Sequence, residues 1–107
     1  MTTFDKREEG FEKQFAHDEE LKFKATARRN RMLGLWAAEK LGLSGAEAEN
    51  YARSVVFAEF EQGGDRAVVD KIRKDLEDKG VVQSEHQISR TMTELMAKAV
   101  ADVKAGR

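Results

Sequence analysis

His17 and His86 are the residues of this chain best suited to acid–base or metal chemistry near neutral pH. Neither has a second histidine at ligand spacing, and cysteine is absent, so neither a metal site nor thiol chemistry is expected. The sequence also lacks a phosphate-binding glycine loop, a nucleophile elbow and an HExxH pattern. We therefore predict that the chain is not an enzyme and needs no cofactor, while adenine-nucleotide binding is left open.

Three phenylalanines near the N-terminus have a spacing that suits binding to another protein. Phe4, Phe11 and Phe15 are separated by seven and four residues, so a helix would place all three rings on one face. Charged residues occupy most positions between them, and Gly10 costs about 1 kcal/mol relative to alanine in a helix. Such a segment is expected to be mostly disordered alone and to become helical against a partner.

The candidate partner-binding residues of this segment are its aromatic anchors, the neighbouring charges and the histidine at its end. They are Phe4, Lys6, Arg7, Glu8, Phe11, Glu12, Phe15 and His17. The carboxylates of residues 18–20 favour the charged form of His17, which could tune binding near neutral pH, but the preferred interpretation is a solvated residue at a helix start. The aromatic stripe also has a second interpretation, in which it folds back and completes the core of its own chain.

A basic run follows this segment. Residues 22–31 contain five bases and no acid, whereas residues 1–20 contain three bases and seven acids. The change of sign could orient the segment in a charged groove, or the bases could form an ordinary solvated face. Nucleic-acid binding is not expected, because the run is short and the net charge of the chain is -1. The candidate groove contacts are Lys22, Lys24, Arg28, Arg29 and Arg31.

Apolar periodicity and helix-end signals predict an all-α fold for the rest of the chain. Helices are expected over about 18–41, 45–62, 66–79 and 85–104, forming a four-helix bundle-like domain of residues 18–107 behind a mobile segment of residues 1–17. Capping boxes are expected at Ser44 and Ser84, and Asp65 is expected to cap the third helix. Trp36 is expected as a core anchor, and Phe60 is expected on the apolar face of the second helix.

No apolar run approaches the roughly 20 residues that a membrane-spanning helix needs. The charged N-terminus does not resemble an export signal. We therefore expect a cytoplasmic protein without direct membrane insertion.

A family resemblance is carried by residues 15–43, FAHDEELKFKATARRNRMLGLWAAEKLGL. Together with MTTFDKRE, GAEAENYA and FEQGGD, this stretch resembles the zeta inhibitor family of the alphaproteobacterial F-type ATP synthase over nearly the whole chain. The resemblance implies a four-helix protein whose mobile N-terminal region, here roughly Thr2 to His17, enters an interface between alpha and beta subunits and stops ATP hydrolysis. The mode of action is similar to that of the mitochondrial inhibitor protein, although the overall folds differ.

On this resemblance, the partners are the alpha and beta subunits of the catalytic head, with the gamma subunit as a further candidate. The protein would be associated with the membrane-bound ATP synthase through that head. Phe4, Phe11 and Phe15 would be the inserted anchors. The alternative is a helical interaction module whose aromatic segment binds some other helix-accepting groove.

Overall fold

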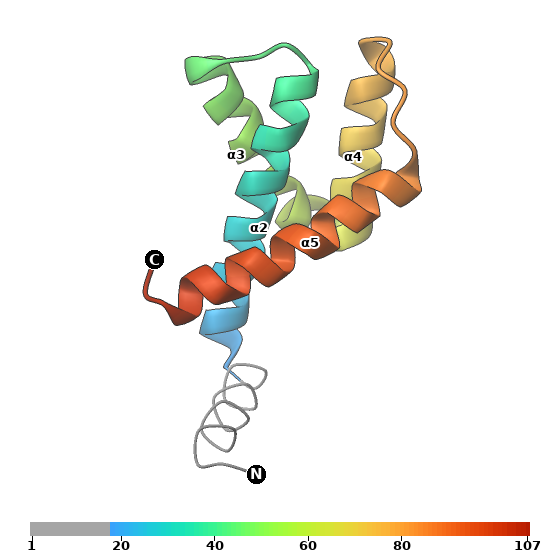
Figure 1. The fold of residues 1–107 in the computed structure, drawn as a ribbon. Coiled ribbons are helices and arrows are strands. Elements are labelled where there is room, and N and C mark those ends of the chain that lie inside the picture. The colour runs from blue at the N-terminus through green and yellow to red at the C-terminus, as the bar shows by residue number, and fades with distance from the viewer. Residues whose placement is uncertain (1–17) are drawn as a thin grey trace.

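A computed structural model describes residues 18–107, which form four α-helices and no strand (Figure 1). The helices are α2 (Glu19–Lys40), α3 (Gly45–Gln62), α4 (Asp65–Asp78) and α5 (Glu85–Lys104). The prediction of an all-α, four-helix domain is confirmed. The predicted inhibitory segment, residues 1–17, lies outside the described residues.

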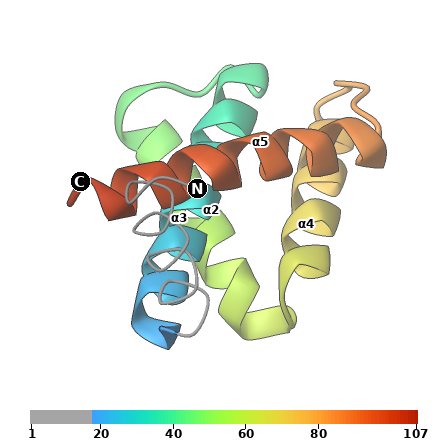
Figure 2. The ribbon, with the colours of Figure 1, turned by 60° about the horizontal axis from the view of Figure 1, so that its bottom comes forward.

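Helix α2 is the centre of this arrangement. It packs against α3, α4 and α5, whereas α3 and α5 have no contact with each other. After the short turn at the end of α2, α3 runs back beside it, and α5 crosses the other side of α2 (Figures 1 and 2). Every other helix therefore fixes the position of α2, the helix that follows directly on the predicted inhibitory segment.

Gly34 allows α2 and α3 to pack closely. A Cβ atom at this position would lie 2.7 Å from the Cα of Ala52 and 3.3 Å from the Cβ of Val55. Ala37 and Ala38, on the next turn of α2, are also fully buried. Small side chains at such a contact let two helix backbones approach each other, and here they determine how α2 sits on α3.

The hydrophobic core draws on all four helices. Its largest fully buried apolar side chains are Leu33, Val55, Val68, Ile72, Leu76 and Ile88. Trp36 and Tyr51 are partly buried and pack against this core. The prediction that Phe60 belongs to the apolar face of its helix is wrong, because Phe60 is 52% exposed and its ring lies 5.2 Å from that of Phe23 instead.

The helix starts confirm one expected cap and correct two others. Ser84 forms the predicted capping box, in which its Oγ accepts a hydrogen bond from the N–H of Gln87 at 3.1 Å. Ser44 is the N-cap of α3, but its side chain makes no capping hydrogen bond, so the predicted box is absent. Gly64, not Asp65, is the N-cap of α4. Asp65 is the first residue of α4, and its carboxylate binds Arg29.

Candidate functional site

The candidate site is the start of α2, where the chain leaves the predicted inhibitory segment. Asp18 caps the helix, since its Oδ1 accepts hydrogen bonds from the N–H groups of Glu20 at 3.0 Å and Leu21 at 3.2 Å. Glu19 and Glu20 follow in the first turn, where carboxylates interact favourably with the helix dipole. The described chain therefore enters α2 through a well-defined helix start directly after residue 17.

Four of the five candidate groove contacts are at least partly exposed, and each is paired with an acid of its own chain. The pairs are Lys22–Glu19 (3.5 Å), Lys24–Glu20 (3.3 Å), Arg28–Asp102 (3.0 Å) and Arg31–Glu49 (2.9 Å). Surface pairs of this kind contribute at most about 1 kcal/mol each, so acids of a partner could replace them at little cost. In the free protein, however, these pairs neutralise much of the positive charge of the run.

Arg29, the fifth candidate, is buried and faces the interior. Its side chain is 3% exposed, and its Nη2 lies 2.7 Å from Asp65 Oδ1 and 3.5 Å from Glu59 Oε1. Its Nε and Nη2 also donate hydrogen bonds to Asn30 Oδ1, at 3.0 and 2.8 Å. Arg29 therefore ties α2 to the end of α3 and the start of α4, and we remove it from the candidate groove contacts.

The acids around Arg29 carry one more negative charge than the guanidinium can balance. Burial, followed by the interactions with Asp65, raises the pKa of Glu59 from 4.5 to about 7. The hydrogen bond from Arg29 is the main cause that lowers the pKa of Asp65. Glu59 Oε2 and Asn30 Nδ2 are buried without a hydrogen-bond partner in the described part of the chain. This cluster is therefore expected to exchange a proton near neutral pH.

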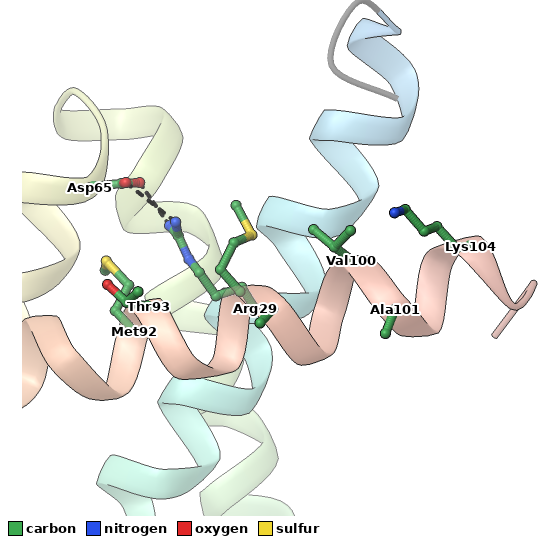
Figure 3. Close-up of a pocket in the computed structure, with 9 residues that line it drawn as sticks. Arg29, Asp65, Met92, Thr93, Val100, Ala101 and Lys104 are labelled. Carbon is green, nitrogen blue, oxygen red and sulfur yellow. Dashed lines mark hydrogen bonds and ion pairs between the residues drawn. The ribbon is translucent and has the colours of Figure 1, made fainter. Parts of the chain in front are cut away.

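A hollow of about 710 Å³ lies beside this cluster (Figure 3). Arg29 and Asp65 stand at one end of it, and Lys104 also contributes to its lining. Figure 3 shows the Arg29 side chain directed toward Asp65, and its guanidinium is held there by the ion pair. Side chains of α5, including Met96 and Val100, line the rest of the hollow. The hollow is therefore mainly apolar, and its buried cation is already bound by a carboxylate.

The anchors and charges predicted for the N-terminal segment, from Phe4 to His17, lie outside the described residues. Within residues 18–107, no three metal-ligating side chains come together in a group that could hold a metal ion. No helix in the same part of the chain is long and apolar enough to cross a membrane.

Sequence reasoning missed two features of α2 and α3. The first is the ion pair between the buried Arg29 guanidinium and Asp65, a partly exposed residue 36 positions away along the chain. The second is the exposure of Phe23 and Phe57, which are 55% and 57% exposed. Phe23 lies outside the apolar rows of α2, and this was the one sequence signal that could have revealed its exposure.

Comparison with known proteins gives this site a context. A protein known from a solution NMR structure is 42% identical to this chain, with a TM-score of 0.70, and the match covers 81% of this chain and 99% of that one. No curated protein matches the sequence. The family model for ATPase inhibitor subunit zeta matches residues 1–102 and so includes the predicted inhibitory segment. Because this match covers nearly all of its length, the chain belongs to the family of ATPase inhibitor subunit zeta.

Proposed function

We propose that this chain inhibits ATP hydrolysis by an F-type ATP synthase, and that residues 2–17 do so by entering a catalytic interface between alpha and beta subunits. The family match carries this proposal, because it begins at residue 1 and includes the aromatic segment. The position of α2 supports it, since a capped helix that contacts all three other helices follows directly on the segment.

The energetics of insertion favour a partner that closes around the segment. Burial of three phenylalanine side chains contributes about 2 kcal/mol each, or roughly 6 kcal/mol in total. Ordering some 15 residues costs on the order of 1–2 kcal/mol per residue. The rings alone therefore do not suffice, and backbone hydrogen bonds and ion pairs must add to them. An interface that closes during hydrolysis supplies such contacts, so inhibition should depend on the conformational state of the enzyme.

The helical domain acts as the handle in this proposal. Lys22, Lys24, Arg28 and Arg31 lie on the helix that follows the segment, and they would exchange their internal acids for acids of the alpha, beta or gamma subunit. The domain would thus dock on the outside of the catalytic head in the cytoplasm and hold the segment at its interface.

A truncation tests the proposal. The full-length chain and a chain of residues 18–107 are titrated into purified ATP synthase, and hydrolysis and synthesis are measured separately. The full-length chain should slow hydrolysis far more than synthesis. The truncated chain should not inhibit, while its far-UV circular dichroism should still show a folded helical domain. Full inhibition by the truncated chain would refute the insertion mechanism.

Two point variants of the full-length chain sharpen this test because their effects have opposite sign. Phe11→Ala removes about 2 kcal/mol of burial and should weaken inhibition roughly 30-fold. Gly10→Ala lowers the cost of forming a helix by about 1 kcal/mol and should strengthen inhibition up to about fivefold. Binding to the enzyme without any effect on hydrolysis would instead favour an interaction module.

A further inference from the structure

Three phenylalanines, which we call the aromatic patch, are exposed where α2 and α3 lie side by side. Phe23, Phe57 and Phe60 are 55%, 57% and 52% exposed. The rings of Phe23, on α2, and Phe60, on α3, lie 5.2 Å apart with an angle of 32° between their planes. Phe57 precedes Phe60 by three residues and is its neighbour on the helix surface. The patch therefore joins the two helices by ring-to-ring contact.

The fold does not need the exposed halves of these rings. The contact between α2 and α3 is already closed at Gly34 and Ala52, and the core residues Leu33 and Val55 are fully buried. The other large apolar side chain that is exposed within residues 18–107 is Val82, which lies in the connection between α4 and α5. Single exposed apolar residues are ordinary, but two aromatic rings in contact, with a third one helical turn from one of them, indicate a contact surface on a small domain.

The size of the patch limits what it can do alone. Three half-exposed rings present roughly 300 Å² of apolar surface. A stable protein–protein interface buries about 800 Å² on each partner, and so does a stable dimer of small domains. The patch is therefore too small to hold a partner or a second copy by itself, and it should add to a larger contact formed elsewhere on the chain.

The position of Phe23 shows which contact this is. Phe23 is five residues after Asp18, the cap at which the predicted inhibitory segment joins α2. At 1.5 Å per residue, this places it only about 7.5 Å along the helix axis from Asp18. A partner that encloses the chain up to residue 17 therefore comes within reach of Phe23 and of the Phe60 ring beside it.

We propose that the aromatic patch is a second docking surface, which binds an apolar surface of the ATP synthase beside the interface that the N-terminal segment enters. This inference rests on the proposed function. The two contacts belong to one chain, so binding at one raises the effective concentration at the other. The segment then blocks the enzyme, and the patch keeps the inhibitor in place.

The rings of the patch carry no charge, so the surface that binds them should be apolar. The charged residues nearby, such as Lys22 and Lys24 beside Phe23, lie next to the rings and belong to the charged contacts of α2, not to the patch. The contribution of the patch should therefore depend little on salt, because screening weakens interactions of charges and not the burial of apolar surface.

Phe57→Ala in the full-length chain is the decisive test. Phe57 lies on α3, so its removal leaves the helix that carries the segment intact. Loss of half a buried ring should raise the half-inhibitory concentration for ATP hydrolysis about three- to tenfold, with unchanged inhibition at saturation. Val82→Ala is the control, since it shortens an apolar side chain that is even more exposed (96%) and lies away from the patch, and it should stay within about twofold of the parent. Thermal unfolding verifies that both variants are folded.

Each result has a distinct meaning. If the parent chain inhibits hydrolysis and both Phe57→Ala and Phe23→Ala match the Val82→Ala control, the second docking surface is refuted while the proposed function stands. If the parent chain does not inhibit at all, the proposed function fails and the docking surface fails with it. A dimer in sedimentation that Phe57→Ala dissociates would assign the patch to a second copy of the chain and would also overturn the proposal.

Discussion

Replacing Glu59 with glutamine should stabilise the protein at pH 8 and change its stability little at pH 5. The Glu59 side chain is only 13% exposed, and it shares the Arg29 guanidinium with Asp65. Burial and the neighbouring Asp65 raise the pKa of Glu59 to about 7. Glutamine has nearly the shape of the protonated carboxyl group, so the variant keeps the low-pH arrangement at every pH.

The direction of the pH effect follows from proton binding. Because the pKa of Glu59 rises from 4.5 to about 7 on folding, the folded chain holds more protons than the unfolded chain between these two values. The free energy of unfolding of the parent protein should therefore fall as the pH rises through this window. Asp65 acts in the opposite direction, since its lowered pKa gives stability above the ordinary 3.8 that is lost as the pH falls. The cluster should be most stable at mildly acidic pH.

The size of the effect can be bounded. A shift in pKa from 4.5 to about 7 corresponds to at most about 3.4 kcal/mol. Solvent still reaches part of the Glu59 side chain, and its titration is linked to that of Asp65, so about 1–2 kcal/mol is the better expectation. For a domain of this size, that change corresponds to a difference in melting temperature of roughly 5–10 °C.

Urea unfolding followed by far-UV circular dichroism at pH 5, 6, 7 and 8 measures this effect. The parent should lose stability from pH 5 to pH 8, and the curve of Glu59→Gln should be flatter and should lie above the parent at pH 8. Glu61→Gln, at an exposed position on the same helix, controls for the loss of one negative charge. A parent stability that is constant or rises across this range, or a variant that is less stable at pH 8, would refute the reasoning.

Three further substitutions test the packing and the caps by urea unfolding at pH 7. Gly34→Ala should destabilise the protein by about 1–3 kcal/mol. The steric cost of a Cβ atom 2.7 Å from the Cα of Ala52 exceeds the gain from the better helix propensity of alanine. A more stable variant would contradict the close packing. Ser84→Ala should cost about 1 kcal/mol, whereas Ser44→Ala should cost only a few tenths, and equal losses would contradict the observed caps. Tyr51→Phe removes the hydrogen bond to Asp75 at 2.8 Å and should cost about 1 kcal/mol; no loss would indicate that water replaces it.

Local sequence signals were enough to predict the four helices, because glycines and capping residues mark their ends. The caps show where such signals stop being sufficient. Ser84 forms its box with Gln87, but Ser44 is followed by Gly45, whose φ of +55° departs from the regular entry into a helix. The capping-box pattern is therefore present at both serines but forms its hydrogen bonds only at Ser84. Whether the bonds form depends on the backbone geometry, which the residue after the serine influences.

The contacts of α2 could not be predicted in the same way, because they depend on residues far apart in the sequence. Arg29 lies in a run of bases, and its local pattern is that of a solvated face. Only the folded chain brings Asp65 and Glu59 to its guanidinium, and their charges are what allow it to be buried. The prediction for Phe60 was wrong because it also depends on a distant residue. Periodicity places Phe60 on the core side of α3, but the core ends before it, and its ring lies beside that of Phe23.

Arg29 and Gly34 explain how the start of α2 can present exposed residues without weakening the fold. Arg29 holds α2 through the ion pair of its buried guanidinium, and Gly34 holds it through close backbone contact with α3. With the helix held at these points, the turns between Asp18 and Arg28 do not have to contribute large apolar side chains to the core. Phe23 can therefore be exposed there, and the bases around it can be paired by weak surface contacts. Under the proposed function, the helical domain has to hold the inserted segment at the enzyme. A firmly packed α2 with an exposed aromatic and basic start is suited to that task.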